Sequence, residues 1–213
     1  MSRLEISEQK RFQIRTDAIR GLSPMSEAER KGYDIRDIKV GGYFTLAGEN
    51  WKVLSLSRYQ ETSWSFKKEK KYELWELEII SLKSADIKYI EWGVDDSLEI
   101  YLSEERLKFR QLTDEDEQRI GKSDLDRISD QEGGIKYNGK TYWYEDNESW
   151  AAKFYRDNQG REPELVRFYE FESDKGDCIT IEAWYDDDDR ECEIWTSKEV
   201  KPHDIQPLQL GEK

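Results

Sequence analysis

The residues that most often carry out catalysis are scarce in this chain of 213 residues. It has one histidine, His203, which follows Pro202 near the end of the sequence. Serine and cysteine nucleophiles usually depend on a histidine base, and the sequence has no Gly-x-Ser-x-Gly motif. The two cysteines, Cys178 and Cys192, form no known zinc-ligand spacing with His203. We therefore predict that the protein is not an enzyme and holds no cofactor.

A run of four aspartates is the one candidate metal site. Carboxylate oxygens are the ligands that Ca²⁺ prefers, and the run lies in a predicted turn between two strands. A calcium loop usually spaces its ligands and contains a glycine, whereas this run does neither. A solvated acidic turn is the default interpretation, and a metal site is the alternative. The run consists of Asp186, Asp187, Asp188 and Asp189.

Glutamates on predicted strands offer a second chemistry, because paired carboxylates can hydrolyse glycosides. The candidates are Glu76 with Glu170 and Glu91 with Glu182, all beside aromatic residues. Alternation of polar and apolar residues along a strand explains these glutamates without catalysis.

Aromatic residues near predicted strand ends are the better indication of binding. An ammonium group over such a ring gains roughly 0.5–2 kcal/mol, depending on its desolvation. The alternative is that the rings cap small hydrophobic cores. The four candidates are Trp64, Phe66, Trp143 and Trp150.

The charge of the chain limits its partners. With 34 Lys and Arg against 48 Asp and Glu, the formal net charge is -14. Such a field repels nucleic acids and anionic lipids, and attracts basic protein surfaces, polyamines and metal ions. No apolar run approaches the ~20 residues that span a bilayer, and the first residues do not form a signal peptide. We expect a cytoplasmic protein, with reduced cysteines and without membrane insertion.

Four short blocks occur twice, in the same order and at nearly constant spacing, which indicates a tandem duplication. Each block contains aromatic, glycine or serine positions that repeat 91 to 94 residues later. The aligned pairs are Gly48 with Gly139, Trp75 with Tyr169, Trp92 with Trp184, and Ser103 with Ser197.

The alternation around these blocks has a period of two residues, which is typical of antiparallel strands. In the first half it predicts a hairpin over residues 43–46 and 51–56, then strands over 87–94 and 98–102. Along residues 72–79 we expect Glu73, Glu76 and Glu78 to point mostly outward. In the second half the predicted strands are 135–137, 141–145, 150–156, 165–172, 178–185 and 191–197.

These elements predict a mostly β protein made of two tandem small antiparallel β-barrels or bent sheets, packed side by side. Short helices are expected in the N-terminal extension, where Ser26–Glu29 has a capped-helix pattern, and in the linker. The predicted parts are an N-terminal extension (1–37), a first β module (38–112), an acidic and possibly helical linker (113–132) and a second β module (133–210).

The blocks at residues 40–44 and 48–53 resemble the family of domains of unknown function called DUF4178. Its members share a glycine turn and an aromatic–Glu strand, here Trp75-Glu76-Leu77 and Tyr169-Glu170-Phe171. The resemblance covers roughly residues 38–210. It implies a bacterial accessory protein in a membrane-stress or defence-like system.

Three functional hypotheses follow. The first is a non-enzymatic adaptor that binds a protein partner with a basic surface. The second is a small-ligand binder for a polyamine or another cation. The third is an acidic mimic of DNA, against which the 34 interleaved basic residues argue.

Overall fold

The computed structural model describes residues 6–146, 149–156, 162–186 and 189–211. Strands of the first half are β1 (Tyr43–Leu46), β2 (Glu49–Thr62), β3 (Glu69–Ser81), β4 (Ile87–Val94) and β5 (Leu98–Leu107). Strands of the second half are β6 (Thr113–Asp114), β7 (Gly134–Tyr137), β8 (Lys140–Tyr144), β9 (Trp150–Tyr155), β10 (Glu164–Glu172), β11 (Cys178–Asp186), β12 (Asp189–Glu199) and β13 (Gln206–Gln209). The α-helices are α1 (Glu8–Gly21), α2 (Glu27–Arg30) and α3 (Leu125–Asp130), with short 3₁₀ helices that include η1 (Ile35–Asp37) and η4 (Pro202–Asp204).

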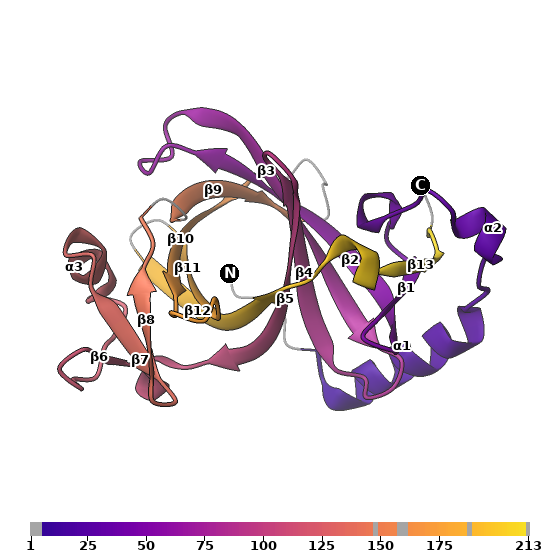
Figure 1. Ribbon diagram of the computed structural model, residues 1–213, viewed down its shortest axis with the longest axis horizontal. Coiled ribbons are helices and arrows are strands. Elements are labelled where there is room, and N and C mark those ends of the chain that lie inside the picture. Colours follow the sequence, from indigo (N-terminus) through magenta and orange to yellow (C-terminus); the bar gives the residue numbers. More distant parts are fainter. Residues whose placement is uncertain (1–5, 147–148, 157–161, 187–188, 212–213) are drawn as a thin grey trace.

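All these strands belong to one antiparallel sheet, in the order β13-β1-β2-β3-β4-β5-β12-β11-β10-β8-β7-β6, and β9 pairs with both β10 and β2. Because β9 connects β10 to β2, eight strands close into a barrel: β2, β3, β4, β5, β12, β11, β10 and β9. The closed ring is visible in Figure 1. The prediction of a mostly β fold is confirmed, and the predicted strands of the second half agree with the observed ones within two residues at each end.

Within the barrel, two strand pairings, which we call seams, join the halves of the chain. At one seam β2 pairs with β9, so that Arg58 lies opposite Tyr155. At the other β5 pairs with β12, so that Ser103 lies opposite Ser197, the position that the repeat aligns with it. An arrangement of two separate modules is not confirmed. Four strands alone would leave the backbone groups of two edges unpaired, and each half satisfies the edges of the other.

The repeated glycines form equivalent tight turns. The β1–β2 turn has positive φ at Ala47 (52°) and Gly48 (75°), and the β7–β8 turn at Asn138 (50°) and Gly139 (75°). Two consecutive positive φ angles are typical of the type I′ turn that joins twisted hairpin strands. The hairpin predicted around Gly48 is confirmed.

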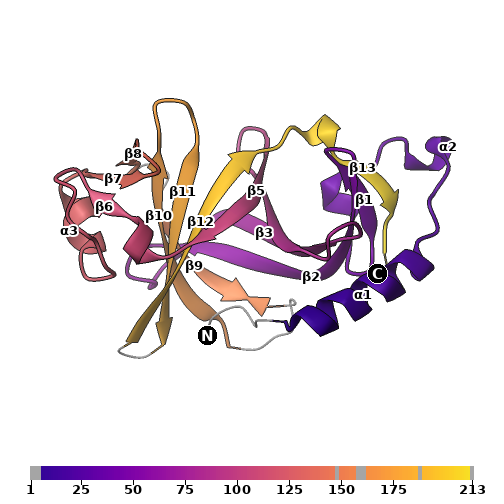
Figure 2. The same ribbon diagram turned by 90° about the horizontal axis from the view of Figure 1, so that it is seen from below.

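The apolar faces of the barrel strands point away from the barrel axis and are covered by the flanking elements. On the first-half side, Leu77 and Ile79 of β3 belong to a core with Phe44 of β1 and Ile205 of the C-terminal segment. On the second-half side, β7, β8 and α3 cover Ile181 and its neighbours. Figure 2 shows these two flanks at opposite ends of the molecule, with the barrel strands between them.

The N-terminal extension and the linker are parts of these flanks. Ser26 caps α2 through a capping box with Glu29, as the sequence predicts. The longer helix α1 was not predicted. In the linker only α3 is α-helical within the described residues, and its Leu125 and Ile128 are buried in the second-half core. The linker is therefore a covering layer of the barrel and not a spacer.

Aromatic rings from several strands meet inside the barrel. Tyr59 of β2 contacts Trp184 of β11, with ring centroids 6.3 Å apart, although these strands are not neighbours in the sheet. Phe154 and Phe168 also contact Tyr59, at 4.7 and 5.2 Å. This cluster fills part of the interior, and the remainder is polar.

Candidate functional site

A cavity of about 350 Å³ lies in the barrel interior, next to the aromatic cluster. Five of its lining residues are glutamates, and none of the described lining residues is Lys, Arg or His. Four are aromatic. The lining consists of Tyr72, Leu74, Glu91, Glu99, Tyr101, Glu145, Trp150, Glu170, Phe171, Glu172, Cys178, Thr180 and Ser197.

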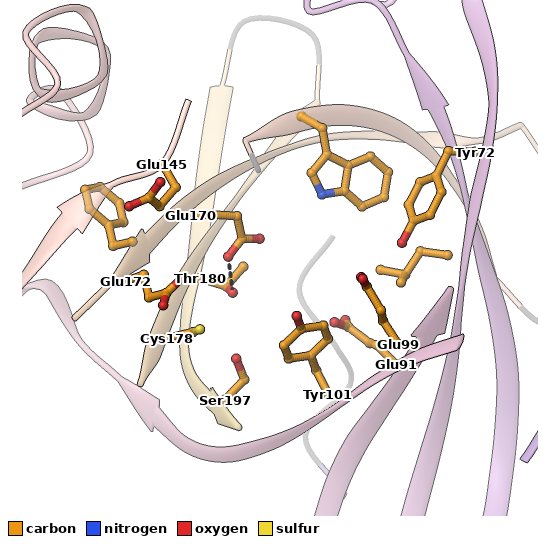
Figure 3. Close-up of a pocket in the computed structure, with 13 residues that line it drawn as sticks. Tyr72, Glu91, Glu99, Tyr101, Glu145, Glu170, Glu172, Cys178, Thr180 and Ser197 are labelled. Carbon is orange, nitrogen blue, oxygen red and sulfur yellow. Dashed lines mark hydrogen bonds between the residues drawn. The ribbon is translucent and has the colours of Figure 1, made fainter. Parts of the chain in front are cut away.

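The carboxylates lie on two sides of this cavity (Figure 3). Glu91 of β4 and Glu99 of β5 lie on the side of the first half, whereas Glu170 and Glu172 of β10 lie on the side of the second half. Tyr101 lies beside the first pair. A ligand in the cavity would therefore meet negative charge on both sides.

Hydrogen bonds hold several of the interior carboxylates. Thr180 Oγ1 donates to Glu170 Oε2 at 2.6 Å. Closer to the aromatic cluster, the Tyr59 hydroxyl donates to Glu76 Oε2 at 3.1 Å, and Glu76 is only 4% exposed. A buried carboxylate without hydrogen-bond partners would destabilise the fold, and these hydrogen bonds offset that cost.

Two further interior glutamates are almost fully enclosed. Glu182 and Glu193 are each 2% exposed. Trp184 Nε1 donates to Glu182 Oε2 at 3.1 Å, and Arg106 forms an ion pair with Glu193 at 3.1 Å. The expectation that strand glutamates point mostly outward is wrong for Glu76. The face that carries these glutamates encloses the interior together with the aromatic cluster, and the opposite face, which is mostly apolar, meets the flanks.

Tyr72 is placed by the residue beside it. A Cβ atom on Gly93 would overlap the Tyr72 hydroxyl oxygen, so the absence of a side chain at Gly93 lets the Tyr72 phenol enter the cavity wall. Burial, followed by the negative charges of Glu99 and Glu91, raises the pKa of Tyr72 well above its ordinary value. The direction of this pKa shift reflects a site that disfavours further negative charge.

The structure separates the four predicted aromatic residues. Trp150 lines the cavity and stacks on Phe168, with ring centroids 4.5 Å apart. Trp143 lies on β8, outside the barrel, and is 42% exposed. Trp64 and Phe66 lie in the turn between β2 and β3.

Trp64 and Phe66 surround a cation that belongs to the protein itself. The guanidinium carbon of Arg167 lies 4.7 Å from the Trp64 ring centre, 5.4 Å from that of Phe66 and 5.0 Å from that of Tyr185. Arg167 also donates to the Trp64 carbonyl and to the Tyr185 hydroxyl. We call these four residues the Arg167 cluster. It ties the β2–β3 turn of the first half to β10 and β11 of the second.

The remaining candidates lie apart from the cavity, except for one cysteine. Cys178 lines it, whereas burial raises the pKa of Cys192 to about 11. The two cysteines form no disulfide, and in the β11–β12 ladder they lie opposite Ser197 and Ala183, not opposite each other. His203 is exposed next to Asp204, at 3.6 Å.

The aspartate run lies partly outside the residues that the structure describes. Asp186 and Asp189 pair at the ends of β11 and β12, whereas Asp187 and Asp188 lie outside the described residues. Among the side chains that the structure describes, no three of His, Cys, Asp or Glu gather in a way that could hold a metal ion. No helix in the described part of the chain is long and apolar enough to cross a membrane.

The predicted acid pairs come together in a way that the sequence did not indicate. Glu91 and Glu170, taken from different pairs, line one cavity, whereas Glu76 and Glu182 are buried elsewhere in the interior. The glutamates Glu99, Glu145 and Glu172 were missed. The available signal was that glutamates recur on one face of strands in both repeats.

Comparison with known proteins gives one match. The family described as Domain of unknown function (DUF4178) matches residues 39–202, a range that includes every strand of the barrel. No curated protein and no solved structure matches the chain.

Proposed function

The chain belongs to the DUF4178 family, and we propose that its barrel binds a small organic cation, an amine, in the interior cavity. The observation that carries the proposal is the composition of the cavity lining: five glutamates and, among the described residues, no basic side chain. Carboxylates withdrawn from bulk water interact strongly with an added positive charge, because the effective dielectric constant is low there.

The aromatic residues of the lining support an organic cation. Tyr72, Tyr101 and Trp150 place ring surfaces beside the carboxylates, and such rings attract ammonium groups by about 0.5–2 kcal/mol. They also cover the methylene groups of an alkyl amine. A volume of about 350 Å³ is at the small end of ligand pockets, which favours a compact ligand such as a short polyamine.

Calorimetric titration with spermidine at moderate salt tests the proposal. We expect saturable binding, and Glu91→Gln and Glu170→Gln should each weaken it at least tenfold by removing one charge from either side of the cavity. Glu117→Gln is the matched control, because Glu117 lies outside the barrel with a side chain that is 83% exposed. Absence of heat at millimolar spermidine, or equal losses in all three variants, would contradict the proposal. Chromatography after the titration should return unchanged spermidine, since we propose binding without catalysis.

A second candidate is the adaptor role, with a basic protein partner in a cytoplasmic membrane-stress or defence-like system. It is supported by the net charge of -14 and by the exposed Trp143 on an outer strand. A partner recovered from the native host should be lost with Trp143→Ala and in high salt. A partner retained under both conditions would argue against this surface.

The DNA-mimic hypothesis receives less support. A mimic must present its carboxylates on the surface at phosphate-like spacing, whereas Glu76, Glu182 and Glu193 are buried in the barrel.

A further inference from the structure

Next to the cavity, the barrel interior contains a much smaller space of about 20 Å³, which we call the inner compartment. Four residues line both spaces, namely Glu91, Tyr101, Thr180 and Ser197. The inner compartment is therefore adjacent to the cavity. Its complete lining is Tyr89, Glu91, Tyr101, Ser103, Thr180, Glu182, Trp195 and Ser197.

The size of the inner compartment limits what can enter it. About 10–15 Å³ of such volume is needed for a single water molecule, so about 20 Å³ accommodates one group of that size. A primary ammonium group is as small as a water molecule. A trimethylammonium group is several times larger, and a planar guanidinium group is also too large.

The chemistry of the lining suits a positively charged donor. Two glutamates contribute to it, and Glu182 is 2% exposed. Hydroxyl groups of Ser103 and Ser197, which lie opposite each other at the β5–β12 seam, add acceptor oxygens. An ammonium group has three donors and no acceptor, which matches a wall of carboxylate and hydroxyl oxygens.

Aromatic rings help to enclose this compartment. Tyr89 and Trp195 pack edge to face, with ring centroids 5.4 Å apart and an interplanar angle of 68°. The Tyr89 backbone N–H donates to Ser103 Oγ at 2.8 Å, which fixes this serine. Packed rings and a fixed serine resist enlargement of the space by a bulky group.

We infer that the inner compartment selects a primary ammonium group of the ligand over methylated ammonium and guanidinium groups. This inference rests on the proposed function. In this arrangement the first ammonium lies between Glu91 and Glu182, and the alkyl chain runs through the larger cavity. A second ammonium of a diamine then lies near Glu170 and Glu172, on the other side of that cavity.

The test compares three ligands of one chain length on the unmodified protein: putrescine, fully N-methylated putrescine and agmatine. We expect calorimetry to show at least tenfold weaker binding of the methylated compound. Agmatine keeps one primary ammonium and should fall between them. Equal affinities for putrescine and its methylated form would overturn the inference and leave the proposed function intact. Absence of binding by all three would overturn both.

A variant that fills the compartment provides a second measurement. Ser197→Val adds bulk at its wall without changing charge, and a β-branched residue suits the strand. We expect at least a tenfold loss of putrescine affinity, whereas the control Thr141→Val, on β8 outside the barrel, should leave it unchanged. Unchanged putrescine binding by a folded Ser197→Val protein, with circular dichroism as the check of folding, would overturn the inference.

Discussion

Removal of the Tyr59 hydroxyl should destabilise the protein through one buried carboxylate. This hydroxyl donates to Glu76 Oε2 at 3.1 Å, and Tyr59 is fully buried. Hydrogen bonds to charged groups contribute about 1.5–3 kcal/mol, and Tyr59→Phe keeps the ring and its aromatic contacts. We therefore expect the free energy of unfolding to fall by about 1.5–3 kcal/mol, which corresponds to a Tm lower by roughly 3–12 °C for a chain of this size.

Urea denaturation of the single variants and of Tyr59→Phe with Glu76→Gln completes a double-mutant cycle. The coupling energy between the two positions should be at least about 1 kcal/mol, because each substitution removes the same charged hydrogen bond. Tyr33→Phe is the control, since Tyr33 is 44% exposed and the substitution should change stability by less than about 0.5 kcal/mol. Additive effects within about 0.3 kcal/mol, or a Tyr59→Phe protein as stable as the control, would refute the reasoning.

Three further predictions concern the cavity wall, the thiols and the Arg167 cluster. Gly93→Ala should displace the Tyr72 phenol and weaken spermidine binding several-fold, as measured by calorimetry, with a folded protein by circular dichroism. Iodoacetamide at pH 8 should label Cys178 much faster than Cys192, because burial raises the pKa of Cys192 from 9.0 to about 11 and lowers its thiolate fraction roughly a hundredfold. Equal labelling rates of the two cysteines, measured by mass spectrometry, would contradict this difference in pKa. Because the Cys192 thiol ionises at a lower pH in the unfolded chain than in the folded protein, its ionisation destabilises the fold as the pH rises from 9 to 11. Arg167→Leu should lower the free energy of unfolding by about 0.5–1 kcal/mol for each lost cation–π contact and speed proteolysis in the β2–β3 turn. An unchanged cleavage rate would contradict the proposal that the Arg167 cluster holds this turn against β10 and β11.

Local sequence signals predicted the strands and turns well, because their causes are local. Gly48 and Gly139 occupy positive-φ positions that few other residues adopt, and so their turns were visible from the sequence. Along residues 72–79 the alternation predicted a strand but not its faces, because Tyr72 and Leu74 line the interior whereas Leu77 and Ile79 belong to the flank core.

The sequence could not show which face of a strand meets solvent. Leu77 and Glu76 are both buried, one beneath a flank and the other inside the barrel. Which face becomes the interior depends on closure of the barrel, in which β2 pairs with β9 and Arg58 lies opposite Tyr155. No periodicity within a strand reports a contact so distant in the sequence. For the same reason, glutamates of both halves were not expected to share one cavity.

The two seams also determine how the protein can form during synthesis. When β5 leaves the ribosome, neither β2 nor β5 has its partner at the seams, since β9 and β12 have not been made. The 92 residues between Leu107 and Glu199 take roughly 5–20 s to translate. Until β9 is made, the seam edges of both β2 and β5 are unpaired, and the β5 edge stays unpaired until β12 is made. Unpaired edges are the usual starting points of intermolecular strand pairing. Slow translation of the second half should therefore reduce the yield of native protein, and a chaperone that covers strand edges should restore it.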